Sequence, residues 1–464
     1  MQALEGLKVL ELGQLIAGPF AGKTLGDFGA DVIKVEPPDS GDPLRTWRLL
    51  RNGTSVWWDV QSRNKRSVCL DLRTPEGQEA VRRLASEADV LIENFKPGTM
   101  EGWGLGWDAL HALNPRLVML RLSGYGQTGP YAHKPGFGIL GEAMGGLRHL
   151  TGEPGRVPVR TGVSIGDSIA ALHGVIGVLL ALFHREARGG QGQMIDVALY
   201  ESVFNLMESL LPEYDAFGAV RERAGSALPG IAPSNAYHCQ DGGYVLIGGN
   251  GDSIFKRLMR AIDRDDLGQD PDLAHNDGRA RRAAELDHAI EAWTRQRTVA
   301  EVVQALDAAQ VPAGPIYSAA DIARDPQYLA RDMILDTTSA DGLPLKVPGI
   351  VPKLSATPGQ LRHLAPTLGQ HTAEVLAAPR WPERSSPMNQ PHHPDPAHEQ
   401  ERLTNLEIKA SVNDDWIEEL NAQVYRQQLQ IEQLQRELAR LCNRLDDGTP
   451  GAFRSLRDEL PPHY

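Results

Sequence analysis

Short runs of β-branched and aliphatic residues alternate with amphipathic stretches over the first 126 residues, and this alternation limits the possible folds more than any other feature. A stretch such as TPEGQEAVRRLASEA (74–88), which lies between two of these runs, has the spacing of polar and apolar residues expected of a helix. Because strands that alternate with helices form parallel sheets, the sequence predicts an α/β fold with a mostly parallel sheet. The runs are KVLEL (8–12), DVIKV (31–35), SVCLDL (67–72), DVLIENF (89–95) and LVMLRLSGYG (117–126).

Changes in composition along the chain predict how it is divided. Residues 1–224 are expected to form the first part of a large α/β domain, and residues 225–320, punctuated by Gly and Pro, a smaller domain. Residues 321–378 are expected to return to the large domain. Residues 379–402 are rich in Pro and His and almost devoid of large aliphatic side chains, which predicts a disordered linker.

A regular apolar repeat occupies the C-terminal region from 403 to 446. Positions three and four residues apart hold mostly Leu, Ile or Val, with polar breaks at Asn413 and Gln427. This spacing predicts a coiled coil that self-associates, and the linker before it should make the coil dispensable for the chemistry of the preceding domains. Residues 447–464 form a tail that ends in PPHY.

Composition and charge exclude several classes of protein. The chain has 464 residues and a net charge of −13, which argues against nonspecific binding to nucleic acid. It contains no uninterrupted run of 18 apolar residues, and its N-terminus does not have the pattern of a secretion signal, so neither membrane insertion nor secretion is expected. Three scattered cysteines provide neither a disulfide framework nor a metal site, and they fit a cytoplasmic protein.

One carboxylate, Asp167, begins the otherwise apolar segment VSIGDSIAALHGVIGVLLALF (163–183). From Ile169 onward the apolar residues recur with helical spacing, which predicts a buried helix. Asp167 stands where an N-cap residue would stand, and capping is its simpler interpretation. The alternative is a carboxylate nucleophile held at the positive end of the helix. The segment alone does not decide between them.

Seven motifs that follow one another along the chain resemble those of the class III coenzyme A transferases, the CaiB/BaiF family, over about residues 3–378. Within this family, the sequence of the whole stretch most resembles the succinyl-CoA:dicarboxylate transferases of the glutarate type. The C-terminal region, ending in PPHY, resembles SlyX, a small coiled-coil protein. The motifs are IAGPFAGKTLGDFGADVIKVEPPDSGD (16–42), NKRSVCLDLRTPEG (64–77), ADVLIENFKPGTMEGWGLGW (88–107), LSGYGQTGP (122–130), GDS (166–168), GQGQMIDVALYES (190–202) and LGQHTAEVL (368–376).

The resemblance implies a large Rossmann-like domain and a small domain, in a homodimer whose two subunits interlock. It also implies that Asp167 is the nucleophile, which would form a mixed anhydride with the acyl group and then a thioester with CoA. Acyl-CoA and small carboxylic acids would be the substrates, with no permanently bound cofactor and no metal. An apolar helix behind Asp167 would help to exclude water from these hydrolysable intermediates.

The resemblance also assigns CoA contacts, though unevenly. Pro37 and Gly102 stand where family members often carry arginine, so Lys96 or Lys65 would have to help hold the nucleotide. Phe137 takes the place of a tyrosine near the nucleophile. The implied contacts are Gln14, Leu15 and Ala17 after the first strand, Leu70 and Arg73 near the adenine and phosphates, and Asn94 and Phe95 at the pantetheine.

Arginines near the nucleophile suggest the class of acceptor. Arg160 lies seven residues before Asp167, and its planar guanidinium could hold the distal carboxylate of a dicarboxylate through two hydrogen bonds. Arg45 and Arg48 are further candidates for this role.

Two other functions remain as alternatives at this point. The first is an α-methylacyl-CoA racemase, but those enzymes use a histidine where this chain reads Gly136-Phe137-Gly138, so one proton-transfer group is missing. The second is a non-enzymatic scaffold built on the coiled coil.

Overall fold

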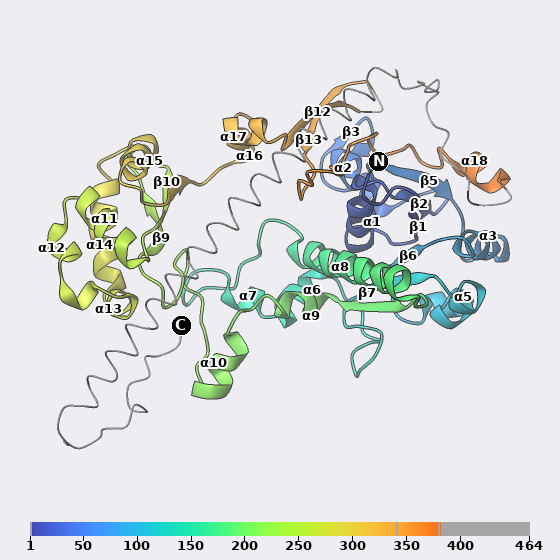
Figure 1. Ribbon diagram of the computed structural model, residues 1–464, viewed down its shortest axis with the longest axis horizontal. Helices are drawn as coiled ribbons and strands as arrows, with labels where there is room; N and C mark the ends of the chain where they lie inside the picture. Colours follow the sequence, from blue (N-terminus) through green and yellow to red (C-terminus); the bar gives the residue numbers. More distant parts are fainter. Residues whose placement is uncertain (1, 340–341, 379–380, 382–464) are drawn as a thin grey trace, which may run out of the picture. The chain divides into compact units, whose positions relative to one another are not determined.

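The computed structural model describes residues 2–339, 342–378 and 381 (Figure 1). Contacts within the chain divide it into residues 1–384 and residues 385–464. The linker expected from residue 379 and the coiled coil expected over 403–446 lie outside the described residues, apart from Trp381.

A six-stranded parallel sheet organises the large domain, in the order β5-β2-β1-β6-β7-β8. Numbered along this sheet alone, the order is 3-2-1-4-5-6, which is the order of Rossmann folds. The predicted α/β fold is therefore confirmed. The strands are β1 (Lys8–Glu11), β2 (Asp31–Glu36), β5 (Lys65–Cys69), β6 (Val90–Glu93), β7 (Val118–Ser123) and β8 (Met194–Ala198).

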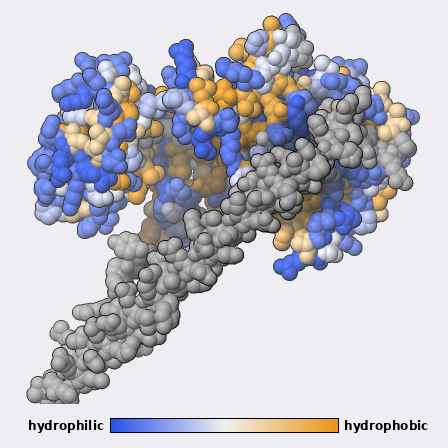
Figure 2. All heavy atoms as spheres, turned by 45° about the horizontal axis from the view of Figure 1, so that its top comes forward, coloured by the Kyte–Doolittle hydropathy of each residue, from blue (hydrophilic) through white to orange (hydrophobic). Residues whose placement is uncertain are grey.

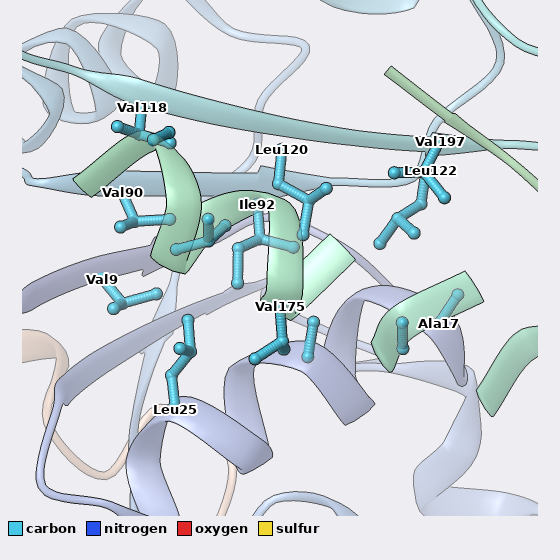
Figure 3. Packing of buried hydrophobic residues seen from close by; sticks show 14 of the residues in the cluster. Val9, Ala17, Leu25, Val90, Ile92, Val118, Leu120, Leu122, Val175 and Val197 are labelled. Carbon is cyan, nitrogen blue, oxygen red and sulfur yellow. The ribbon is translucent and has the colours of Figure 1, made fainter. Parts of the chain in front are cut away.

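Helices cover both faces of this sheet because alternate strand residues point to opposite sides. On one face, Val9, Val90 and Leu120 pack with α1 (Ala17–Asp27) and α8 (Ile165–Arg188), as Figure 3 shows. On the other face, strand residues such as Leu10 and Leu91 pack with α3 (Pro75–Ala85) and α5 (Trp107–Leu113). Strands buried on both faces explain why their sequences are continuous apolar runs.

Helix α8 differs from the sequence-based expectation in how it is buried. Its small residues, among them Ala170, Gly174 and Val178, face the sheet, where a Cβ on Gly174 would meet Leu120 at 2.8 Å. The large side chains that defined its helical spacing point away and are exposed. In the chain by itself, the prediction of a fully buried helix is wrong. The exposed side chains are Leu172, Ile176, Leu179, Leu180 and Phe183.

By length and composition alone, α8 could cross a membrane, and it is the only such helix among the described residues. The core helix of a soluble protein passes the same test, and 44% of the apolar window of α8 is buried inside the protein. Arg185 in its last turn is buried and pairs with Asp89 at 2.8 Å. These contacts favour a helix that belongs to the core.

A second group of elements, within residues 234–315, has a core of its own. The antiparallel sheet β11-β10-β9 packs against helices through Tyr237, Val245, Phe255, Leu258 and Trp293. The elements are β9 (Ser234–His238), β10 (Tyr244–Gly248), α11 (Asp252–Ala261), α12 (Asp265–Gly268), η2 (Pro271–Leu273), α13 (Asn276–Arg281), α14 (Ala283–Thr294), α15 (Val299–Ala308) and β11 (Ala313–Pro315).

After this group the chain returns to the β5 edge of the large sheet. The His371 amide donates to the Ser67 carbonyl at 2.9 Å, and Trp381 Nε1 donates to Asp31 Oδ2 at 2.9 Å. The elements of the return are α16 (Ala319–Ile322), α17 (Pro326–Ala330), β12 (Ile334–Thr338), β13 (Pro344–Pro348) and α18 (Thr372–Ala377).

The remaining elements are short segments that connect the strands and helices of the large sheet. They are η1 (Pro43–Thr46), β3 (Leu50–Arg51), β4 (Thr54–Ser55), α2 (Val56–Gln61), α4 (Thr99–Gly102), α6 (Gly138–Met144), α7 (Leu147–Leu150), α9 (Leu199–Phe204) and α10 (Leu210–Phe217).

Candidate active site

The candidate site lies where the strand order of the large sheet reverses. Strands β1 and β6 are neighbours there, and their chains leave the carboxyl edge toward opposite sides. In open α/β sheets such a switch point leaves a crevice in which ligands bind. Residues that follow β1 and β6, among them Gln14 and Asn94, line a cavity of about 630 Å³ at this place.

This cavity brings together most of the residues that the sequence singled out. Asp167 and Arg160 line it, together with Phe137, which lies just before α6. Arg48, one of the two further arginine candidates, also lines it. Trp47 and Trp57, which were not predicted from the sequence, add aromatic walls. The predicted CoA-contact residues in the lining are Gln14, Leu15, Ala17, Asn94, Phe95 and Lys96.

The loops after β1 and β6 are tied to each other at two points. Asn94 Oδ1 accepts from the Gln14 amide at 2.8 Å, and Asn94 Nδ2 donates to the Gln14 carbonyl at 2.8 Å. Gly13 permits this approach, since a Cβ there would lie 3.0 Å from Asn94 Oδ1. The amide of Asn94 therefore clamps the first loop of the cavity.

Buried charged side chains also hold the loop that follows β1. The Lys34 ammonium contacts the Gly13 carbonyl at 2.6 Å and Asp42 Oδ2 at 2.9 Å. Asp42 in turn accepts from the amide of Leu15, whose φ of +63° is unusual for leucine and is held by these contacts. Although burial opposes it, the carboxylates of Asp42 and Glu11 keep the pKa of Lys34 above its ordinary value.

Lys65 belongs to this buried network and not to the nucleotide. Its ammonium is fully buried and contacts Glu11 Oε2 and the Pro19 carbonyl, each at 2.7 Å. It faces neither cavity, so of the two lysines suggested for the nucleotide only Lys96 stays a candidate.

Asp167 lies in the first turn of α8 but does not occupy the N-cap position. Ser164 is the N-cap residue, and Asp167 is the third residue of the helix. The side chain faces the start of α6, where a Cβ on Gly138 would lie only 2.0 Å from Asp167 Oδ2. The simpler interpretation of Asp167 as a cap is therefore wrong, and glycine at 138 gives the carboxylate its place in the cavity.

Burial raises the pKa of Asp167 from its ordinary value of 3.8 to about 6, and the carboxylate of Glu142 adds to the increase while Arg160 opposes it. A perturbed carboxyl group in a cavity is typical of functional sites. At neutral pH the group is ionised, and its higher basicity favours nucleophilic attack.

A second cavity of about 310 Å³ shares Gln14 and Phe95 with the first. It is lined by Leu70 and Arg73, the two residues assigned to the adenine and phosphates, and by Pro37. The Arg73 side chain is exposed and pairs with Asp71 at 2.8 Å. Two cavities that share lining residues suit an elongated ligand whose nucleotide and reactive ends lie apart.

Arg45, by contrast, does not reach the site. Its guanidinium binds Glu36 through two hydrogen bonds, of 2.7 and 2.8 Å, and stacks 3.9 Å over the Trp58 ring. It lines neither of the two cavities. The Nε–Nη2 edge of Arg45 thus serves the fold, and the geometry does not support the expectation that Arg45 binds substrate.

Glu142, whose side chain is buried in α6 behind Asp167, was not among the residues predicted from the sequence. Its position four residues after Gly138, on a short helix, gave no signal of its own. No group of three potential metal ligands occurs among the described residues.

Asn94→Ala tests the clamp on the first loop. We expect this substitution to raise the KM for the acyl-CoA and to lower stability by about 1–3 kcal/mol, since both backbone groups of Gln14 lose their partner. Initial rates against acyl-CoA concentration and thermal unfolding would measure the two effects. An unchanged KM would contradict a role of this loop in CoA binding.

The sequence matches CoA-transferase family III over residues 4–372 and SlyX over residues 399–464. The first match covers more than half of the chain, and the chain therefore belongs to CoA-transferase family III. It carries a SlyX region at its C-terminal end.

Characterised relatives and solved structures agree with this assignment. The chain is 51% identical to succinyl-CoA–D-citramalate CoA-transferase of Chloroflexus aurantiacus, over 80% of this chain and 93% of the relative. It is 36% identical to succinate–glutarate CoA-transferase of Agrobacterium fabrum, over 82% and 97%. A CaiB/BaiF family protein from Brucella suis is similar in structure, with a TM-score of 0.71 and 39% identity over 81% of this chain and 99% of the other.

Proposed function

We propose that this chain transfers CoA from succinyl-CoA to a short dicarboxylic acid, with Asp167 as the covalent nucleophile. One observation carries the proposal: Asp167 shares a cavity with the loops that follow β1 and β6, at the switch point of the sheet. The names of the relatives support the two substrates, since both name succinate or succinyl-CoA together with a dicarboxylate.

The reaction would proceed in four steps. The Asp167 carboxylate attacks the thioester carbonyl of succinyl-CoA and expels the CoA thiolate, which leaves a succinyl–aspartyl anhydride. The thiolate then attacks the aspartyl carbonyl and releases succinate, giving an aspartyl-CoA thioester. The acceptor carboxylate attacks this thioester and expels the thiolate, and the thiolate finally attacks the acceptor's carbonyl in the new anhydride. The acceptor leaves as its CoA ester, and Asp167 is regenerated.

In these steps, this chain would hold the reacting carboxylate in position. Holding a carboxylate against a bound thioester is worth roughly 7–11 kcal/mol when the two are well aligned. Gly138 leaves room for the Asp167 side chain, and α8 packs its small residues behind it on the sheet. Both features keep the nucleophile in one place.

The proposal is tested by incubating the protein with succinyl-CoA and a panel of mono- and dicarboxylates, with mass spectrometry of the CoA esters. We expect new esters of short dicarboxylates, including citramalate, malate or glutarate. Esters formed as readily from monocarboxylates would contradict the choice of acceptor. Epimerisation of a 2-methylacyl-CoA would favour the racemase alternative, although no histidine is present among the described residues that line the cavity.

Arg160→Leu tests how the acceptor is recognised. Arg160 faces the cavity, and its side chain is 44% exposed, so a substrate carboxylate can reach it. We expect the KM for dicarboxylate acceptors to rise by about tenfold to a hundredfold, because a charge-assisted pair is lost. The KM for succinyl-CoA should change less, since CoA supplies most of its contacts. An unchanged acceptor KM would rule out this role.

We also propose that a second copy of the chain covers the exposed face of α8. This apolar stripe consists of Leu172, Ile176, Leu179, Leu180 and Phe183, and Figure 2 shows hydrophobic side chains gathered on the surface of the described part. Helices α6 and α9, which pack against α8, add the exposed Leu140, Met144 and Phe204. Large continuous apolar faces usually mark association surfaces.

Ile176→Glu combined with Leu180→Glu tests this interface. These side chains are 53% and 64% exposed in the single chain, so the charges are tolerated in a monomer but not in a buried interface. In a chain ending at residue 383, without the SlyX region, we expect a dimer that becomes a monomer in the double variant. Analytical ultracentrifugation measures the mass.

Leu113→Glu is the matched control for this interface, since Leu113 is exposed at the end of α5, away from the stripe. We expect it to stay dimeric. A monomeric parent chain, or a double variant that stays dimeric, would contradict the proposed interface.

A further inference from the structure

One buried carboxylate near the nucleophile has no role in the four steps above. The Glu142 side chain is only 1% exposed, and its Oε1 atom has no hydrogen-bond partner. A buried charged oxygen without a donor is destabilising, and such groups are usually retained for a reason other than stability. Gly166, directly before Asp167, leaves room for it, since a Cβ there would lie 3.3 Å from Glu142 Cγ.

Two arginines flank this carboxylate unequally. Arg148 Nη2, from α7, donates to Glu142 Oε2 at 3.3 Å. Arg160 Nη2 lies 3.6 Å from Glu142 Oε1, too far for a hydrogen bond but close enough for a strong electrostatic attraction. Arg148 is the more enclosed of the two, whereas Arg160 also faces the cavity.

Asp167 interacts electrostatically with both Glu142 and Arg160. Glu142 and Arg160 act on its carboxyl group with opposite signs. The other charged side chains that line the cavity are the cations Arg48, Lys96 and Lys134. Arg160 therefore interacts with two carboxylates, that of the buried Glu142 and that of the proposed nucleophile.

We propose that Glu142 is a positioning residue: its buried carboxylate holds the Arg160 guanidinium beside the cavity, so that Arg160 receives the distal carboxylate of a dicarboxylic substrate and does not pair with Asp167. The inference rests on the proposed function, because it assigns the acceptor's second carboxylate to Arg160. It adds a residue that does not touch the substrate and acts through another side chain.

The physical reason is competition for one cation. A guanidinium paired directly with Asp167 would bind both carboxylate oxygens and lower their basicity, which weakens the nucleophile. Glu142, which does not line the cavity, offers Arg160 an anion other than Asp167. Because Arg148 supplies a hydrogen bond to Glu142, Arg160 can share its charge with an incoming carboxylate without leaving Glu142 unpaired.

Glu142→Gln is the main test, because it removes the charge but keeps the shape. We expect the KM for dicarboxylate acceptors to rise about tenfold, while the KM for monocarboxylates stays the same, so that selectivity between the two classes falls. Removal of the Glu142 charge should also lower the pKa of Asp167. The fall of the transfer rate at acidic pH should therefore occur at lower pH. A change that is equal for both classes of acceptor would mean a merely structural role and would overturn the proposal.

A double-mutant cycle decides whether Glu142 acts through Arg160. In the Arg160→Leu background, Glu142→Gln should have no further effect on the acceptor KM, whereas independent roles would give additive effects. Glu142→Asp, which keeps the charge but shortens the side chain, provides a second variant and should show a smaller loss of selectivity. Equal selectivity in Glu142→Asp, Glu142→Gln and the parent would also overturn the proposal.

Glu79→Gln is the matched control, since Glu79 pairs with Arg82 at 3.0 Å on an exposed part of α3. We expect it to leave both acceptor constants unchanged. Covalent labelling of the parent protein by succinyl-CoA separates this inference from the proposed function. Labelling without the predicted loss of selectivity contradicts the role of Glu142 alone, and absence of labelling contradicts the proposed function itself.

Discussion

We expect Asp167→Asn to abolish CoA transfer while the chain stays folded. The amide has nearly the same shape but is a poor nucleophile and cannot form the anhydride, so the loss should be on the order of 10⁵-fold, the size expected for a well-aligned attacking group. Steady-state rates with succinyl-CoA and a dicarboxylate would measure it. Substantial transfer by the variant would show that another group attacks the thioester.

The same substitution should make the protein more stable at neutral pH. The pKa of Asp167 is raised from 3.8 to about 6 in the folded chain, so between these values the folded state binds more protons than the unfolded state. The free energy of unfolding of the parent therefore falls as pH rises through this range, and above pH 6 the buried charge is a net cost. The asparagine variant lacks this cost.

Thermal unfolding at two pH values measures this effect. The difference in Tm between Asp167→Asn and the parent should be larger, in favour of the variant, at pH 7.5 than at pH 4. The transfer rate of the parent should fall about tenfold per pH unit below the pKa, because only the ionised carboxylate attacks. A pH-independent difference in Tm would contradict the assigned burial of the charge.

Gly138→Ala should have the second largest effect on transfer. The new Cβ would lie 2.0 Å from Asp167 Oδ2 and 2.7 Å from its Cγ, so the carboxylate must move away from its present place. We expect kcat to fall by about 10²-fold, the loss that a displacement of about 1 Å can cause. Gly138 is the first residue of α6, so the helix preference of alanine adds little there, and a lower unfolding temperature would report the steric contact with Asp167.

Gly314→Ala is the control, because a Cβ at Gly314 meets nothing within 4 Å and the residue lies in β11 of the antiparallel sheet β11-β10-β9. Full activity in Gly314→Ala and loss of activity in a folded Gly138→Ala variant would support the geometry of Asp167. Full activity in Gly138→Ala would show that the carboxylate has room to move without loss of function.

The strands of the large sheet could be predicted wherever they are buried on both faces. Their apolar runs, such as those around Val9 and Leu91, are continuous because helices cover both sides. The edge strand β8 was not predicted as a strand, since Met194 and Asp196 are exposed and no apolar run marks it. The order of the strands also could not be predicted, because it depends on contacts between residues far apart in the sequence.

The burial of α8 was misjudged for a related reason. Helical periodicity identifies the apolar positions but not which of them face the sheet. Small residues such as Ala170 and Gly174 allow the closest approach, and they were not counted as core positions. The large side chains Ile176 and Phe183 are left exposed in the single chain.

In the site, sequence patterns identified loop residues that line the cavity more readily than the residues that hold them in place. Asn94 lies in a recognisable motif directly after β6, Gln14 follows the first predicted strand, and both line the same cavity. Arg160 and Arg45 were both candidates for the acceptor carboxylate, yet Glu36 binds Arg45 and only Arg160 lines the cavity. The role of each arginine depends on its partner, and the sequence does not show which partner that is.

Covalent trapping of the enzyme by succinyl-CoA tests the central claim most directly. The protein is incubated with succinyl-CoA without acceptor, quenched with hydroxylamine or borohydride and digested, and the modified peptide is identified by mass spectrometry. The account predicts modification at Asp167, in the first turn of α8, and none in Asp167→Asn. Modification at another residue, or transfer through a complex of both substrates with no covalent species, would contradict it.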